Sequence, residues 1–335
     1  MPIPFILGAI AVGAGLVGAK KAMDASDKNS QAKRIQREAK EIFERAKRNL
    51  QQERETTDRA LATLGRAKID ILHGSITRFV DTFGKIHHVE LTGSQGMDEL
   101  AGFEVNNNTL RDMRKLGSLA TQMASGAVEG LAGGGLVALG AYGAVGLLAH
   151  AGTGAAIAGL SGVAATNATL AWLGGGTLAA GGLGVAGGTA VLGGLVAGPA
   201  IALMGFAMDS KADENLDRAR SNRAKARRAA EEMDLASDVC SKITKRADMF
   251  TRLMADVDTL FQPLIGEMET IVRQMGTDYR NYSKEAKKTI AMVLSTASVV
   301  KNILDTPILT QKGNVTTESL TTYNKVENFL SKVQS

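Results

Sequence analysis

Few residues of this chain have the types and spacing that catalysis requires. The run Gly182-x-Gly184-x-x-Gly187 has the form of a dinucleotide-binding fingerprint, whose glycines let the backbone approach a pyrophosphate. Such a fingerprint follows a β-strand, but no β-branched stretch precedes this run, and glycine is so dense here that a chance match is expected. The chain has no Gly-Lys-Ser/Thr phosphate-binding loop, no Gly-x-Ser-x-Gly elbow and no His-Glu-x-x-His zinc motif. The motifs therefore indicate no reaction.

Histidine and cysteine offer no better candidate for chemistry. His87 and His88 are adjacent, and we interpret them as part of a solvated loop rather than as metal ligands. Cys240 has no histidine neighbour and falls on a predicted helical face, which indicates an inert thiol. As the only cysteine, it also excludes an internal disulfide and a multi-cysteine zinc site. We predict a protein that is not an enzyme and holds no cofactor or metal.

The composition predicts helices of two different kinds. The chain has 335 residues, 22% of them charged and 44% hydrophobic, and its formal net charge is only +5. Aromatic residues, at 4%, are too sparse for a typical β-sandwich or an aromatic-lined cleft. Of the 38 glycines, 25 fall in residues 117–208, whereas the flanks have the composition of charged helices. We expect an all-α fold in which long helices and a coiled coil flank a central glycine-rich apolar helical hairpin.

The central segment has the composition of a membrane-inserting element. Residues 130–208 are 79 consecutive positions without Asp, Glu, Lys or Arg. Interior glycines cost about 1 kcal/mol each relative to alanine in a water-exposed helix, whereas lipid forces the backbone to satisfy itself as a helix. Glycines four residues apart also let helices pack closely, as in a glycine zipper. We predict membrane-packing roles for Gly126, Gly130, Gly134, Gly184, Gly188, Gly194 and Gly198.

Charges at the borders of the apolar segments predict orientation. Residues 1–19 are apolar and uncharged, and because Lys20 and Lys21 follow rather than precede them, we expect a retained helix instead of a cleaved signal. Basic residues also border the central block on both sides, which predicts cytoplasmic borders and an even number of crossings. Two crossings that turn near the interface anchor Trp172 are our first interpretation, and four are the alternative. We assign lipid-headgroup contacts to Lys20, Lys21, Arg223, Arg227 and Arg228.

The flanking sequences are helical in propensity and periodicity. In the first flank we expect a helix capped by Ser26 or Asp27 that pauses at Gly74. In the second flank apolar residues recur every three or four positions, which predicts an oligomerisation seam that includes Leu253, Val257, Leu260 and Leu264. Pro263 lies inside this seam, and Thr317 is expected to cap a last helix. The two flanks also match at an offset of 185 residues, so that both continue an apolar stretch into a charged helix.

These patterns divide the chain into five parts. They are an apolar N-terminal helix at residues 1–19, a helical arm with a loop at 20–116, a glycine-zipper hairpin at 117–208, a coiled-coil arm at 209–305 and a short C-terminal helix at 306–335.

Residues 165–199, ATNATLAWLGGGTLAAGGLGVAGGTAVLGGLVAGP, resemble a glycine-zipper segment of uncharacterised bacterial membrane proteins and, more loosely, the interferon-inducible small membrane proteins. The order of long helices around an apolar hairpin is also similar to α-helical pore-forming toxins of the cytolysin A and haemolysin BL type, and distantly to apolipoprotein L. The first resemblance implies bacterial origin and membrane contact. It supplies no catalytic residue.

Three functions are compatible with the sequence. The first is a membrane-active protein that inserts its glycine-zipper hairpin and oligomerises into a pore or lesion, as a toxin or anti-phage effector would. The alternative is a non-leaky membrane-anchored scaffold or membrane-shaping protein whose coiled coils recruit partners, and a third is a helical assembly that hides its apolar segment between subunits. We expect a lipid bilayer and a homo-oligomer as partners, allow a protein partner and a soluble form before insertion, and expect no nucleic acid.

Overall fold

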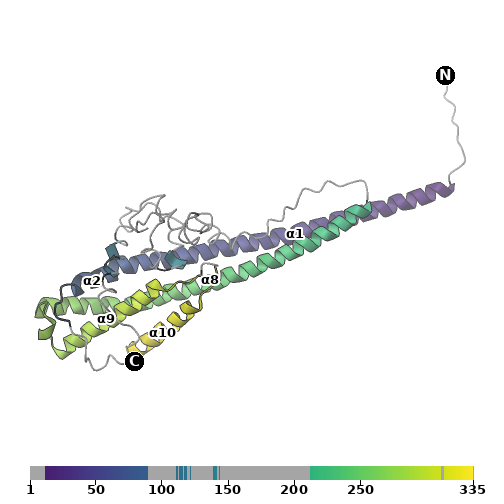
Figure 1. Cartoon of the computed structure of the whole chain (residues 1–335). Helices are drawn as coiled ribbons and strands as arrows, with labels where there is room; N and C mark the ends of the chain where they lie inside the picture. The colour runs from purple at the N-terminus through teal and green to yellow at the C-terminus, as the bar shows by residue number, and fades with distance from the viewer. Residues whose placement is uncertain are drawn as a thin grey trace, which may run out of the picture. The chain divides into compact units, whose positions relative to one another are not determined.

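A computed structural model describes residues 12–89, 212–310 and 313–334, together with residues 111, 113–115, 117, 118, 121, 139–141 and 143. The helices are α1 (Val12–Ile71), a π-helical turn η1 (Leu72–Ile76), α2 (Thr77–Phe83), α8 (Ala212–Met275), a 3-10 turn η5 (Tyr279–Asn281), α9 (Lys284–Asp305) and α10 (Thr317–Gln334) (Figure 1). Within the described residues the only β-type pairings are two isolated bridges. The predicted all-α fold class is confirmed.

Helix α1 is longer than the sequence pattern predicted. Its 60 residues begin at Val12, so the predicted N-cap at Ser26 or Asp27 is wrong, because the helix already runs through both positions. The apolar residues before Lys20 and the charged residues after it share one continuous helix, in which alanine and long charged side chains supply high propensity. At Gly74, where the sequence predicted a pause, the helix widens into a π-helical turn but continues into α2 without stopping.

The later helices begin and end at specific side chains. Helix α8 continues through Pro263 to Met275, and Gly276 follows it with a φ of +79° that favours glycine. Ser283 caps α9 by accepting a hydrogen bond from the amide of Ala286. The predicted cap of α10 is one residue too late, because the hydroxyl of Thr316, not Thr317, accepts from the amide of Ser319.

The described helices divide into two compact units, which we treat separately. The first unit contains α1 up to Gln52 and α8 up to Ser237. Its interface consists largely of alanine, with a few larger apolar side chains. The buried positions are Ala32, Ile35, Ala39, Phe43, Ala46 and Leu50 of α1 and Leu216, Ala219, Ala226, Ala229, Ala230 and Met233 of α8. These residues recur mostly every three or four positions, as in a two-stranded coiled coil.

The two helices of the first unit run in the same direction. The side-chain amide of Asn215 donates to that of Asn29, and Arg223 pairs with Glu38, so the sequence separations of these pairs are 186 and 185 residues. A constant difference between paired residue numbers requires parallel helices, whereas an antiparallel pair would keep the sum constant. The buried positions of the two helices align at a separation of 187 residues, as in Ala39 and Ala226, so the 185-residue offset of the sequence lies two residues from the register of the pair.

The second unit is a helical bundle with a large apolar core. It contains the rest of α1, with α2, the rest of α8, α9 and α10. Helix α9 lies deep in this core, and its side chains at Ile290, Val293 and Val300 are fully buried. Aromatic rings from different helices also pack there, since the ring centroids of Phe79 in α2 and Phe261 in α8 are 5.8 Å apart. The four seam residues belong to this core: Leu253, Val257 and Leu264 are buried, and Leu260 packs against the same cluster.

Several predicted elements lie outside the described residues. They are the N-terminal segment before residue 12, Trp172, the seven membrane-packing glycines and the central hairpin 117–208 except for residues 117, 118, 121, 139–141 and 143. Lys20 and Lys21 lie within α1, of which only the backbone is described at these positions. Among the residues that the structure describes, no helix combines the length and apolar composition needed to cross a bilayer.

Candidate functional site

The paired helices of the first unit concentrate positive charge. Residues 218–228 contain six Arg or Lys and no acid, and residues 33–40 contain four Arg or Lys and one acid, Glu38. Arg223 and Arg227 of α8 approach Glu38 of α1 at 3.2 and 3.5 Å. Each pair is at least partly exposed, so it adds only about 0–1 kcal/mol to stability. Two of the predicted headgroup contacts, Arg223 and Arg227, therefore already have an acidic partner, whereas Arg228 is exposed.

Because the helices are parallel, the chain enters both from the same end of the first unit. In the sequence, the uncharged run 1–19 includes the first residues of α1, and the uncharged run 130–208 ends three residues before α8, with Asp209, Ser210 and Lys211 in between. An antiparallel pair would have placed these entries at opposite ends. The pairing thus places the starts of α1 and α8 at the same end of the first unit, ahead of the basic residues of both helices.

A short part of the apolar run packs into the second unit. Leu139 and Ala141 are buried there, and the carbonyl of Ala141 accepts hydrogen bonds from the amides of Ile308 and Leu309. Gly140 lies so close to α1 that an added Cβ would be 2.0 Å from the carbonyl oxygen of Leu61. We call these contacts of residues 139–141, together with those of Gly143, the seat. Only glycine fits at position 140, because the obstructing atoms are backbone.

Gly143 completes the seat against the end of α9. Its φ of +75° is in the left-handed region, and a Cβ there would meet the carbonyl oxygens of Leu304 and Asp305 at 2.7 and 2.8 Å. Both the conformation and the space therefore require glycine. Residues 126–149, an apolar part of the predicted membrane-inserting hairpin 117–208, thus include residues that the structure places in a protein core.

Lys68 lies beside the seat and is fully buried. Its ammonium nitrogen approaches the carbonyl oxygen of Leu304 at 3.4 Å, the same carbonyl that faces Gly143. Burial lowers the pKa of Lys68 to about 7 from 10.5, and the nearby negative charge of Asp305 opposes this shift. Asp305 is itself ion-paired with Lys301. The charge of Lys68 is therefore only partly compensated.

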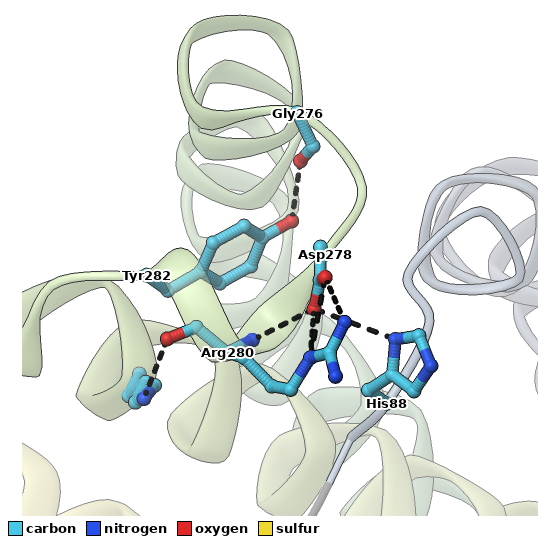
Figure 2. A network of polar contacts seen from close by, with 6 residues as sticks. His88, Gly276, Asp278, Arg280 and Tyr282 are labelled. Atoms are coloured by element: carbon cyan, nitrogen blue, oxygen red, sulfur yellow. Dashed lines mark hydrogen bonds and ion pairs between the residues drawn. The ribbon is translucent and has the colours of Figure 1, made fainter.

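A polar network joins the residues after α2 to the turn after α8 (Figure 2). Asp278 accepts hydrogen bonds from the guanidinium and the backbone amide of Arg280, and lies 3.4 Å from the His88 ring nitrogen Nδ1. The hydrogen bonds from the Arg280 side chain are the main reason that the pKa of Asp278 lies well below its usual range. The Tyr282 hydroxyl donates to the carbonyl of Gly276 across the same turn. Two backbone bonds join His87 to Thr277 and Tyr279, so the network is a clasp that holds the loop.

The histidine and cysteine considered as candidates for chemistry lie in surroundings that do not favour catalysis. His88 has a φ of +59° and is partly exposed next to Asp278. Cys240 is buried, its backbone carbonyl accepts from the Thr57 hydroxyl, and burial raises the pKa of its thiol, which makes the nucleophilic thiolate scarce at neutral pH. Within the described residues no group of three or more His, Cys, Asp or Glu side chains could hold a metal ion.

Two features of these sites escaped the sequence interpretation. Lys68 continues the spacing of Leu61, Leu64 and Leu72, so a lysine at a core position was the available signal. The seat left no signal, because Gly140 and Gly143 resemble every other glycine of the apolar run.

Comparison with known proteins adds no relative. The chain matches no protein-family model, no curated protein and no solved structure.

Proposed function

We propose that the protein is a membrane-active helical protein that inserts its glycine-zipper segment and oligomerises into a pore or lesion. The observation that supports the proposal is the parallel pairing of α1 and α8, which start at the same end of the first unit, each with an apolar run before its basic residues in the sequence. A single lipid surface at this end of the first unit would accept both apolar runs, while the charged helices stay in water.

The seat supports a step that precedes insertion. Segment 126–149 is long enough to enter a bilayer, but residues 139–141 are buried against α1 and the chain after α9. Insertion of this segment requires that the seat be emptied. Occupation of the seat favours a second function, in which the remaining apolar residues anchor the protein without leakage and the bundle serves as a scaffold.

The seam would not recruit partners in its observed surroundings. Leu253 and Val257 are buried in the core of their own chain, so a partner would have to displace that core. A homo-oligomer formed through the glycine faces of the apolar run needs no such displacement.

Dye release from anionic vesicles, run beside flotation of the same vesicles, tests the proposal. We expect wild-type protein to bind and release dye, and Gly184→Leu to bind without release, because the added bulk prevents close helix approach. Gly184→Ala keeps a small residue at the same position and is the matched control. Gly266→Leu is a control outside the run, where an added Cβ meets nothing within 4 Å. Binding without release by the wild type would favour the scaffold, and absence of binding would refute both functions.

A further inference from the structure

The basic residues of the first unit are not equivalent. Arg223 and Arg227 reach Glu38, which marks one flank of the helix pair. Lys40 is two residues from Glu38, and Lys225 is two residues from both arginines. Two residues correspond to about 200° around an α-helix, so Lys40 and Lys225 project to the opposite flank.

The opposite flank contains basic residues from both helices. Lys33, Arg37 and Lys40 are spaced by four and three residues on α1, and Arg218 and Lys225 are seven apart on α8, so each set shares a face. All five side chains are exposed. Among the described contacts only Arg218 has an acidic neighbour, Glu214 at 3.9 Å. We call these five residues the basic flank.

We propose that the basic flank binds the surface of an anionic bilayer, with lipid phosphates and carboxylates as its ligands. The inference rests on the proposed function and specifies the surface that brings the protein to the membrane. It differs from the sequence prediction, which assigned headgroup contact to Arg223 and Arg227, the two arginines that already pair with Glu38.

Two observations favour lipid over nucleic acid. In the sequence an uncharged apolar run precedes each part of the basic flank, 1–19 before Lys33 and 130–208 before Arg218, and clusters of Lys and Arg beside membrane-inserting segments attract anionic lipid. The flank also lacks the aromatic side chains on which single-stranded bases stack, since the aromatic residue of this stretch, Phe43, is buried between the helices.

The test compares two triple variants with the same change in charge. Lys33→Gln, Lys40→Gln and Lys225→Gln remove three charges of the basic flank, whereas Lys242→Gln, Lys245→Gln and Lys288→Gln remove three exposed charges of the second unit. Flotation is measured with phosphatidylcholine vesicles that contain or lack phosphatidylserine. Each lysine near an anionic surface changes partitioning about fivefold, so the flank variant should lose about a hundredfold on the anionic vesicles. The control variant should bind as the wild type does.

Other outcomes separate the two proposals. If wild-type protein floats with anionic vesicles and both triple variants bind equally well, the basic flank is refuted while the proposed function stands. Equal losses in both variants would show an effect of net charge alone and would also refute the flank. If wild type floats with neither vesicle, the proposed function fails as well. Titration with labelled duplex DNA and single-stranded RNA completes the test, because selective loss of nucleic-acid binding in the flank variant would replace lipid as the ligand.

Discussion

The buried lysine makes the stability of the chain depend on pH in a predictable direction. Lys68 is expected to bind a proton up to a pH of about 10.5 when the chain is unfolded, but only up to about 7 when folded, because burial disfavours its charge. Between these values the unfolded chain holds more protons, so stability rises with pH. Below about pH 7 both states are protonated, and this group adds no further dependence.

The size of the effect follows from the same two pKa values. At about pH 7 the shift costs the folded state about 4 kcal/mol, and about 2 kcal/mol of that is recovered by about pH 9. Lys68→Met keeps an unbranched apolar side chain in the same space but carries no charge. The variant loses the contact with the Leu304 carbonyl, worth about 1 kcal/mol, so we expect a net gain of about 3 kcal/mol at pH 7.

Denaturant unfolding followed by far-ultraviolet circular dichroism, repeated at several pH values, measures this prediction. Wild-type stability should rise between about pH 7 and pH 9, and Lys68→Met should lack that rise. Lys245→Met, at an exposed position of α8, is the matched control and should follow the wild type. Parallel curves for wild type and Lys68→Met would refute the reasoning, because they would show that the lysine pays no cost of burial in the folded state.

Three further predictions concern the second unit. Ser298→Ala should raise the melting temperature in a thermal scan by an amount equivalent to about 1 kcal/mol, because the buried hydroxyl has no hydrogen-bond partner among the described residues; a lower melting temperature would contradict this. Leu253→Ala should lower the free energy of unfolding by about 2–5 kcal/mol, since it leaves a cavity in the core, and unchanged stability with altered oligomerisation would instead place the residue in an intermolecular seam. Asp278→Asn should speed amide exchange at His87 and Tyr279 while core amides of α9 stay protected, because the carboxylate joins Arg280 and His88 at the clasp; unchanged exchange at both amides would show that the backbone bonds alone hold the loop.

Local periodicity explains why the sequence predicted so many of the helices. The apolar residues of α9 recur at helical spacing, and Pro307 and Gly313 follow the helix. Residues close together in the sequence were therefore enough to predict α9. In contrast, the direction in which α1 and α8 pair and the residues that contact each other depend on positions far apart in the sequence. Nothing near Glu38 indicates that Arg223 is its partner, although these two residues are separated by the same 185 positions as the sequence match between the flanks. The burial of Lys68 also depends on a distant part of the sequence. A lysine is ordinarily predicted to be exposed, and its contact with the Leu304 carbonyl at the end of α9 cannot be predicted from its neighbours in α1.

The seat holds residues 139–141 of the apolar run in the core of the second unit, and a single substitution should displace them. In Gly140→Ala a methyl group would meet the Leu61 carbonyl oxygen at 2.0 Å, and because this atom belongs to the backbone of α1, one of the two backbone segments must shift. Residues 139–141 should therefore leave the seat. The amides of Ile308 and Leu309 would then lose their acceptor at Ala141, and their hydrogen exchange should accelerate.

The same variant links the seat to membrane activity. If an occupied seat holds back insertion, Gly140→Ala should release dye from anionic vesicles faster than the wild type. Gly266→Ala makes the same chemical change where nothing lies within 4 Å, and it should alter neither exchange nor release. Faster exchange at Ile308 and Leu309 without faster release would separate the two events, since the seat would then stabilise the bundle without restraining the apolar run. Unchanged exchange would refute the seat itself, because the contact at Leu61 leaves no room for a side chain.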